Sequence, residues 1–176
     1  MPKPSEPQLP PWGPFSAVDR ATLVFVIRGD EVLLIRKLQG LGAGKINGPG
    51  GRLEPGESPA DCAKREVEEE VCITPTGLEQ RGELRFQFVD GYSIHGFVFV
   101  ASGHVGEPRA TEEAIPMWFS RGAIPYAEMW ADDRLWMPLL LGGKRFRGRF
   151  LFDGDTMLEH ELVVDENLTV APYHAK

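Results

Sequence analysis

The chain has 176 residues, of which 42% are apolar, and this size and composition indicate one folded domain rather than a disordered segment. Its 19 basic and 26 acidic residues give a net charge of −7, which disfavours non-specific binding of nucleic acid polymers or anionic membranes. Two cysteines cannot staple a small secreted fold, and no apolar run approaches the roughly 20 residues of a membrane span, so we expect a reduced, cytoplasmic protein.

Residues 1–20 are rich in proline and predict an extended arm, because proline lacks the amide donor that helices and sheets require. The arm has no apolar stretch of the kind found in a signal peptide. The favoured interpretation is a disordered tail without function. The alternative is that Trp12 and Phe15 dock onto the domain.

The folded part begins with two predicted strands. The run ATLVFVI at 21–27 is typical of a buried strand, and EVLLIR at 31–36 returns after a turn at Arg28-Gly29-Asp30. The following stretch, 38–56, is rich in glycine and predicts a loop around one short strand.

A helix is predicted over 59–71. Ser58 is a suitable N-cap, Pro59 fits the first helical position, and Asp61 complements the positive end of the helix dipole. Four small or aliphatic residues share one stripe of this helix and should face the core: Ala60, Ala63, Val67 and Val71.

Two further strands are predicted after the helix, at 82–89 and 94–101, with a turn at Asp90-Gly91 between them. A third apolar run, IPMWF at 115–119, predicts another strand.

The last part of the predicted domain contains two short helical pieces and a hairpin. The helical pieces lie near 121–128 and 132–141, and Pro138 should kink or split the second. The runs 144–152 and 156–164 alternate in polarity around an Asp-Gly turn and predict a hairpin.

No internal repeat or linker divides residues 21–165, so we predict one domain there, followed by a tail over 166–176. The pattern of strands with a few helices indicates a mixed sheet and an α/β or α+β fold class.

Three carboxylates of the predicted helix share one face. Glu66, Glu69 and Glu70 have the spacing i, i+3, i+4, and Arg65 can pair with Glu69 one turn away. A divalent cation such as Mg²⁺ would turn their repulsion into attraction, and the glycine turn that ends at Gly51 lets a backbone carbonyl approach that ion. The alternative is an ordinary solvated helix face.

The stretch GRLEPGESPADCAKREVEEEVCI resembles the Nudix box, G-x5-E-x7-R-E-U-x-E-E-x-G-U, where U is aliphatic. One position departs, because Cys72 stands where the family has glycine, and this costs about 1 kcal/mol if the backbone there is left-handed. The matching positions are Gly51, Glu57, Arg65, Glu66, Val67, Glu69, Glu70 and Ile73.

The resemblance implies the Nudix fold, a mixed curved sheet between helices, and a pyrophosphohydrolase that uses Mg²⁺ or Mn²⁺ and a water nucleophile. It implies that Arg65 and Glu57 orient the metal ligands, and that Glu69 or Glu66 is the general base. The metal ligands that it implies are the Gly51 carbonyl and the carboxylates of Glu66, Glu69 and Glu70.

Three segments resemble one branch of this family, the oxidised purine nucleoside triphosphatases that hydrolyse 8-oxo-dGTP and 2-hydroxy-dATP. They are GAGKINGPGG at 42–51, YAEMWADDRLWMPLLL at 126–141 and the hairpin over 144–162. The branch implies base contacts from Asn47, Trp130, Asp132 and Asp133, pocket walls at Phe86 and Thr22, a cation at Lys37 and a further carboxylate near the metals at Glu113.

The residue types suit a purine pocket. Trp130 offers a flat face for stacking, and Asp132 and Asp133, crowded in a dry pocket, would share a proton and so could read both an oxidised guanine and an oxidised adenine. The alternatives are that Trp130 is a core aromatic residue and that the aspartates only cap the helix near 132–141.

The sequence therefore predicts a monomeric enzyme with a small nucleotide as its substrate and no nucleic acid or membrane partner. Two other functions remain open at this point. One is a Nudix hydrolase for ADP-ribose, a dinucleoside polyphosphate or another diphosphate-linked compound. The other is a non-catalytic Nudix module that binds a ligand, which the complete set of glutamates disfavours.

Overall fold

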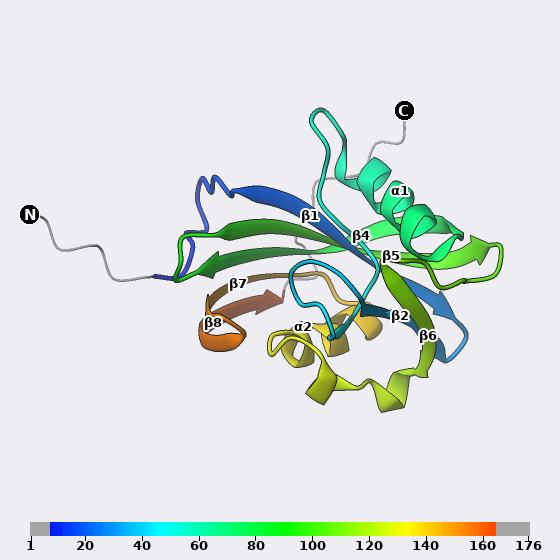
Figure 1. Cartoon of the computed structure of the whole chain (residues 1–176). Helices are drawn as coiled ribbons and strands as arrows, with labels where there is room; N and C mark the ends of the chain where they lie inside the picture. The colour runs from blue at the N-terminus through cyan, green and yellow to red at the C-terminus, as the bar shows by residue number, and fades with distance from the viewer. Residues whose placement is uncertain (1–7, 165–176) are drawn as a thin grey trace, which may run out of the picture.

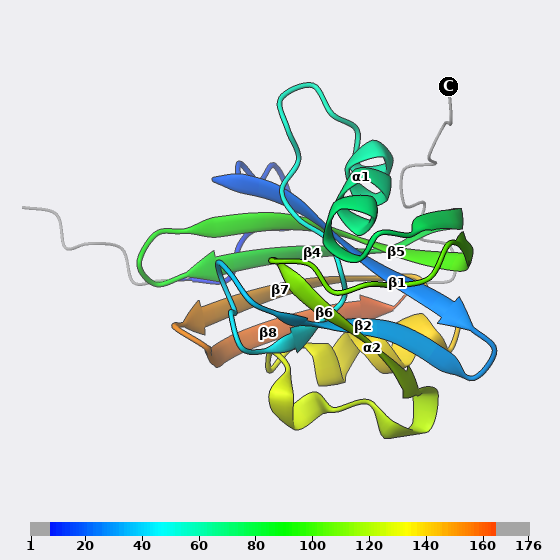
Figure 2. The same cartoon turned by 45° about the vertical axis from the view of Figure 1, so that its right-hand side comes forward.

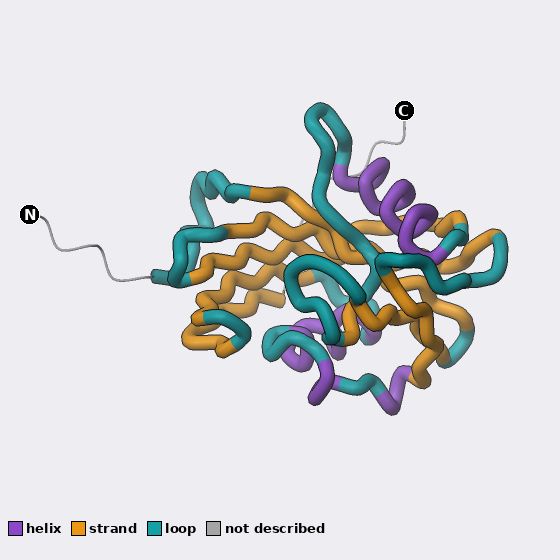
Figure 3. Tube along the Cα trace, viewed as in Figure 1, coloured by secondary structure: helices purple, strands orange, loops and turns teal. Residues whose placement is uncertain are grey.

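Strands from both halves of the chain form one mixed sheet in the computed structural model, which describes residues 8–164. The strand order is β3-β2-β1-β5-β4-β7-β8, and β6 pairs with β2 off this path. Figure 3 shows the strands in orange and the helices in purple. In chain order the elements are β1 (Asp19–Arg28), β2 (Glu31–Lys37), β3 (Ile46–Asn47), α1 (Pro59–Val71), β4 (Thr74–Phe88), β5 (Ser93–Val105), β6 (Ala114–Ser120), the 3-10 turns η1 (Arg121–Ala123) and η2 (Tyr126–Glu128), α2 (Asp133–Leu141), β7 (Phe146–Asp153) and β8 (Thr156–Val164).

Two parallel strand pairs bring distant parts of the chain together. β1 pairs with β5 and β4 pairs with β7 in parallel, whereas the neighbouring pairs β4–β5 and β7–β8 are antiparallel. The mixed sheet is therefore confirmed, and the strands β4 and β5 are longer than the runs 82–89 and 94–101 because their antiparallel pairing continues from Thr74 to Val105.

Helix α1 covers one face of the sheet (Figures 1 and 2). Its predicted span is confirmed, and the Ser58 side chain accepts a 3.1 Å hydrogen bond from the Asp61 amide at its start. The predicted stripe is buried and packs in one core with Val24 and Phe99 of the sheet. Apolar burial on this face fixes the orientation of α1 on the sheet. The stripe residues are Ala60, Ala63, Val67 and Val71.

The opposite face of the sheet carries a second core, to which α2 contributes. The Trp136 side chain is fully buried there, stacked on Phe146 at 5.7 Å between ring centroids. Of the two predicted effects of Pro138, a split is wrong, because α2 runs without interruption from Asp133 to Leu141, and a kink stays a prediction. Pro138 removes one backbone hydrogen bond, and the buried side chains on both sides of it hold the helix to the sheet. The piece predicted near 121–128 is the two separate turns η1 and η2.

The N-terminal arm packs against the sheet over residues 8–18, so the favoured interpretation of a disordered tail is wrong for this segment. The guanidinium carbons of Arg147 and Arg149 lie 4.8 and 4.9 Å from the centre of the Trp12 ring, and the indole donates a 3.1 Å hydrogen bond to Glu161. The guanidinium carbon of Arg85 lies 5.4 Å from the centre of the Phe15 ring. The alternative, docking of the two aromatic residues, is confirmed. Residues 1–7 and the predicted tail over 166–176 lie outside the described residues.

Within residues 8–164, neither α-helix has the length and apolar content needed to cross a bilayer.

Candidate functional site

A cluster of three carboxylates lies beside α1. Glu66 and Glu70 come from the helix and Glu113 from the loop before β6, and one oxygen from each can be chosen so that all lie within 4.8 Å of one another. Glu70 is buried, with 6% of its surface exposed, and its Oε2 atom has no hydrogen-bond partner. A buried carboxylate oxygen without a partner is costly, so the cluster fits a hard divalent cation, which prefers oxygen ligands.

The electrostatics of this cluster lead to the same conclusion. Burial, followed by repulsion from Glu66, raises the pKa of Glu70 to about 8, against the attraction of Lys37. Burial also raises the pKa of Glu66, although the Arg65 guanidinium opposes that shift. Carboxylates with raised pKa values hold protons that a bound cation would replace.

Arg65 is the centre of a hydrogen-bond network next to the cluster. Its guanidinium donates to Glu57 at 2.7 and 2.8 Å, to Glu66 at 2.9 Å and to Glu69 at 3.2 Å. The hydrogen bond from Arg65 lowers the pKa of Glu57 to about 2 and so keeps that carboxylate charged. This network fixes the rotamer of Glu66, which is what the predicted orienting role of Arg65 and Glu57 requires.

The structure brings together three of the four predicted carboxylate ligands. Glu69 pairs with Arg65 on the outer side, its side chain is 51% exposed, and it is not part of the three-carboxylate cluster. Glu113, which is 43 or more positions away from the helix glutamates, completes the cluster at the position of the further carboxylate that the resemblance implies. That Glu69 is a metal ligand stays a prediction.

Gly51 lies against the cluster for a steric reason. A Cβ atom at this position would be 2.4 Å from the carboxyl carbon of Glu66, so only glycine lets the loop pass this closely. The Gly51 carbonyl accepts hydrogen bonds from the Thr22 amide at 2.9 Å and the Cys62 thiol at 3.4 Å. This oxygen is thus engaged by β1 and α1, and its role as a metal ligand stays a prediction. The preceding amide, of Gly50, donates to Glu70.

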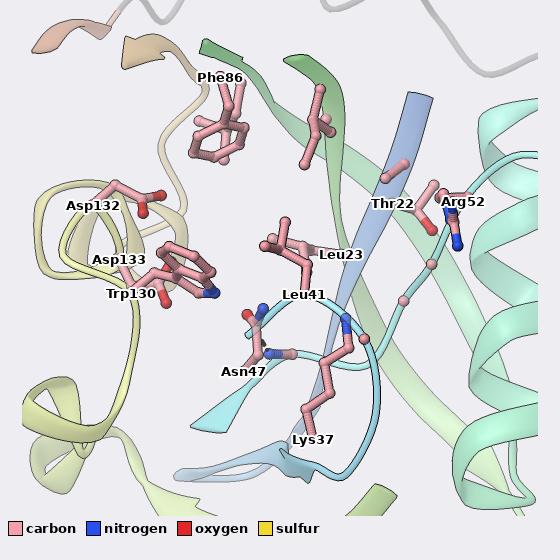
Figure 4. A pocket seen from close by; sticks show the side chains of 18 of the residues that line it. Thr22, Leu23, Lys37, Leu41, Asn47, Arg52, Phe86, Trp130, Asp132 and Asp133 are labelled. Atoms are coloured by element: carbon pink, nitrogen blue, oxygen red, sulfur yellow. Dashed lines mark hydrogen bonds between the residues drawn. The ribbon is translucent and has the colours of Figure 1, made fainter. Parts of the chain in front are cut away.

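A cavity of about 410 Å³ extends from Glu70, one member of the carboxylate cluster, into the second core. Figure 4 shows Trp130 and the two aspartates on one side of it and Thr22 and Arg52 on the other, close to α1. The cavity brings together all seven predicted substrate-binding residues and also reaches Gly51 and Glu70, so one ligand can contact both ends. The seven are Thr22, Lys37, Asn47, Phe86, Trp130, Asp132 and Asp133.

Asp132 and Asp133 are deeply buried, each with 2% of its surface exposed. Burial raises the pKa of Asp132 to about 6, and burial together with the charge of Asp132 raises the pKa of Asp133 well above its usual value. The Asp132 carboxylate accepts a 2.8 Å hydrogen bond from the Trp136 indole and makes no cap bond to α2, whereas Oδ2 of Asp133 has no partner. An acidic group without a partner at a cavity wall is able to bind a polar ligand edge.

Trp130 forms a side wall of the cavity rather than part of a closed core. Its ring lies edge-on to Phe88 and Phe152, with centroids 6.3 and 5.6 Å apart, and the Lys45 ammonium is 5.2 Å from the ring centre. Asn47 points into the same space, and its side-chain oxygen accepts a 2.9 Å hydrogen bond from the Gly48 amide (Figure 4). That bond orients the amide nitrogen of Asn47, a donor that a ligand can use.

Among the residues of the cavity wall that sequence reasoning missed, Arg52 and Tyr92 carry polar side chains. Arg52 follows Gly51 in the loop, and Tyr92 lies in the turn between β4 and β5. Arg52 could have been predicted from its position next to Gly51. A loop that brings Gly51 close to the carboxylates also brings the following side chain close to them. Nothing in the sequence around Tyr92 distinguishes it from an ordinary turn residue.

Comparison with known families matches residues 18–140 to the family described as the NUDIX domain. Two curated proteins, each called "Oxidized purine nucleoside triphosphate hydrolase", are similar to the chain over most of its length. The zebrafish (Danio rerio) protein is 42% identical over 84% of this chain and 96% of its own length. The mouse (Mus musculus) protein is 42% identical over 80% of this chain and 92% of its own length.

Among solved structures, the chain is similar to a mutator MutT protein from Bacillus halodurans. The two superpose with a TM-score of 0.75 and 30% sequence identity, over 82% of this chain and 97% of the other.

Proposed function

The chain belongs to the NUDIX domain family, and on that premise we propose that it hydrolyses oxidised purine nucleoside triphosphates, such as 8-oxo-dGTP and 2-hydroxy-dATP, to the monophosphate and pyrophosphate. One observation carries the proposal most directly. A single cavity joins a pair of buried aspartates to an acidic cluster, so a purine at one end leaves its phosphates at the other. The two similar vertebrate proteins, named for the hydrolysis of these nucleotides, support the same substrate class.

The proposed cofactor is Mg²⁺ or Mn²⁺, held by Glu66, Glu70 and Glu113, with Glu69 and the Gly51 carbonyl as further candidate ligands. When bound, such an ion neutralises phosphate charge and lowers the pKa of coordinated water. Arg65 and Glu57 hold the Glu66 carboxylate in place before the substrate arrives. Either Glu66 or Glu69 then accepts the proton of the attacking water.

The purine end of the site is proposed to use the buried aspartates. Burial raises the pKa values of both carboxyl groups and so favours a proton shared by the pair, which then offers both a donor and an acceptor. Trp130 supplies an apolar face for stacking, Asn47 a donor and Phe86 and Thr22 further walls. Lys37 is proposed to pair with a phosphate, which its place in the cavity lining and its attraction to the Glu70 carboxylate support.

The substrate class is tested by incubating the protein with Mg²⁺ and a panel of oxidised, unmodified and methylated purine triphosphates, ADP-ribose and dinucleoside polyphosphates. We expect the highest kcat/KM for an oxidised purine triphosphate, with pyrophosphate as a product. Preference for ADP-ribose or a dinucleoside polyphosphate would replace the proposed substrate by another of the family. A protein inert toward the whole panel would instead be a binding module.

Two sets of variants test the proposed roles. Glu66→Gln should remove most of the turnover because it takes away both a carboxylate charge and the partner of Arg65, and Glu69→Gln shows which of the two glutamates is the base. Asp132→Asn and Asp133→Asn should change the relative activity on oxidised guanine and oxidised adenine. Asp153→Asn, an exposed aspartate at the end of β7, serves as the matched control. If both cavity variants keep the wild-type ratio, the proposed base reading is wrong.

We also propose a reducing compartment such as the cytoplasm, since Cys62 and Cys72 are both free thiols. Size-exclusion chromatography with light scattering tests the predicted monomer.

A further inference from the structure

Asp19, the first residue of β1, connects two walls of the cavity that come from different parts of the chain. Its Oδ2 atom accepts a 2.6 Å hydrogen bond from the Tyr92 hydroxyl and lies 3.6 Å from an Arg52 guanidinium nitrogen. Tyr92 and Arg52 both line the cavity, although Asp19 itself does not. The Asp19 carboxylate therefore holds two side chains of the cavity wall without itself lining the cavity.

The Tyr92 side of this connection reaches the purine end of the cavity. The Tyr92 ring packs against Phe88 at 5.8 Å, and Phe88 in turn packs against Trp130 at 6.3 Å. The Tyr92 carbonyl accepts a 2.9 Å hydrogen bond from the Phe88 amide, which closes the turn between β4 and β5. A shift of Tyr92 would therefore displace Phe88 and, through it, Trp130 in the cavity wall.

The Arg52 side reaches the carboxylate cluster. The Arg52 carbonyl accepts a 3.1 Å hydrogen bond from Arg65, the residue that holds Glu57 and Glu66. The Arg52 side chain is 74% exposed, and Asp19 is the partner that the structure records for its guanidinium within the described residues. Figure 4 shows Arg52 beside Thr22, at the end of the cavity next to α1.

The docked arm fixes Asp19 from its other side. The Val18 amide donates a 2.9 Å hydrogen bond to the hydroxyl of Ser93, a residue with 4% exposure in the first position of β5. Further up the arm, Arg85 of β4 donates to the Gly13 carbonyl at 2.6 Å. Asp19 is thus held between the arm and β5, so its carboxylate does not need to be ordered when a ligand arrives.

We propose that Asp19 is a positioning residue for the nucleotide, which holds Tyr92 and Arg52 at the purine end and the phosphate end of one cavity. Asp19 acts through Tyr92 and Arg52 and makes no contact with the reacting atoms. This role rests on the proposed nucleotide hydrolysis, and it predicts an effect on substrate binding rather than on the chemical step.

Steady-state kinetics of full-length variants test the role. We expect Asp19→Ala and Tyr92→Phe each to raise KM for the preferred oxidised purine triphosphate by about 3- to 10-fold, with kcat within about twofold of wild type. The double variant should be no worse than Asp19→Ala alone, because the two changes break the same hydrogen bond. Asp19→Asn should recover part of the loss, since its amide oxygen still accepts from Tyr92. Asp30→Asn, an exposed aspartate in the turn between β1 and β2, is the matched control.

A second measurement does not depend on activity. Burial and the Asp19 carboxylate raise the pKa of the Tyr92 phenol to about 12. In an ultraviolet titration, with the Tyr92→Phe protein identifying the contribution of Tyr92, Asp19→Asn should lower the pKa of that phenol. An unshifted phenol, an unchanged KM in Asp19→Ala or additive KM increases in the double variant would overturn the proposal. If wild type hydrolyses no oxidised purine, the proposed function fails, and the phenol titration still decides whether Asp19 holds Tyr92.

Discussion

At the scale of single residues, the space around Gly51 shows how closely the loop after β3 approaches α1. The carboxyl group of Glu66 occupies the volume that a side chain at position 51 would need. Glu66 is in turn tied to Arg65, so it has little freedom to move aside. The glycine is therefore required by its neighbour and not only by its own backbone.

This contact predicts the effect of Gly51→Ala. The new methyl group would displace the Glu66 carboxylate by about 1 Å, and misplacement on that scale in an active site costs about 100-fold in rate. We expect kcat/KM to fall by roughly that factor while the protein stays folded, as measured by hydrolysis assays and circular dichroism. Gly122→Ala, where the nearest atom would be 3.9 Å away, is the control. Wild-type activity in Gly51→Ala would show that Glu66 moves without cost.

The metal-site residues also show where sequence reasoning ends. Spacing along a helix correctly predicts that Glu66 and Glu70 share a side, because a helix has a fixed period. Spacing also predicts the pairing of Arg65 with Glu69, which the structure shows. It does not predict that Glu113 joins the cluster, because that depends on the path of a distant loop. Local periodicity determines the face of a helix, whereas the composition of a cluster depends on tertiary structure.

At the scale of elements, α1 ends in a strained conformation. Cys72 adopts a left-handed backbone with φ of 64°, and its amide donates a 3.1 Å hydrogen bond to the Glu68 carbonyl. The family's glycine would adopt this conformation without strain, so the expected backbone cost of cysteine is present here.

Cys72→Gly should therefore stabilise the protein by about 1 kcal/mol, because the relief of left-handed strain exceeds the added entropy of the unfolded glycine. Urea denaturation followed by circular dichroism measures the change. Cys72→Ala keeps the strain and should show no such gain. If both variants have the same stability, the left-handed conformation carries no appreciable cost.

The N-terminal arm is the second element whose contribution can be measured. Trp12 combines contacts to two guanidinium groups with a hydrogen bond to Glu161. Trp12→Ala should lower the free energy of unfolding by about 2 kcal/mol. Val18→Ala, in which the replaced side chain is 64% exposed, should change it by less than about 0.5 kcal/mol. Equal effects of the two variants in urea denaturation would mean that the Trp12 contacts do not stabilise the fold.

At the scale of the whole molecule, buried acids make stability depend on pH. The pKa of Glu70 rises from its ordinary value of 4.5 in the unfolded chain to about 8 in the folded protein. A raised carboxyl pKa means that the folded state binds the proton more tightly, so this contribution to stability is fully present below about pH 4.5 and is lost as the pH rises toward 8. Asp132, with a pKa of about 6, acts in the same direction.

We therefore expect the Tm of metal-free protein to fall between about pH 5 and pH 8, and Glu70→Gln to reduce that fall. Added Mg²⁺ should raise the Tm of wild type most strongly at the upper end of this range, because it binds the charged carboxylates. Thermal denaturation in EDTA and in Mg²⁺ measures both effects. If Tm falls with pH equally in wild type and in Glu70→Gln, Glu70 does not cause the pH dependence of stability.

The overall architecture was predictable in its elements and less so in their assembly. The helix α1 and the hairpin β7–β8 follow from local signals, namely a capped amphipathic pattern and an alternating run around Asp-Gly. The docking site of the arm was not predictable, because it depends on where β7 and β8, which are distant from Trp12 in the chain, lie in the sheet. The family resemblance predicted the seven substrate-binding residues that line the cavity. It did not predict Tyr92, which lies in the turn between β4 and β5.

The position of the arm has a consequence for the order in which the nascent protein folds. The indole of Trp12 and its acceptor Glu161 are separated by 149 positions in the chain. Ribosomes add about 5 to 20 residues per second, so roughly 7 to 30 s pass before the strand that receives this tryptophan has been synthesised. During translation the tryptophan therefore stays exposed to chaperones and proteases, and its docking is among the last steps of folding.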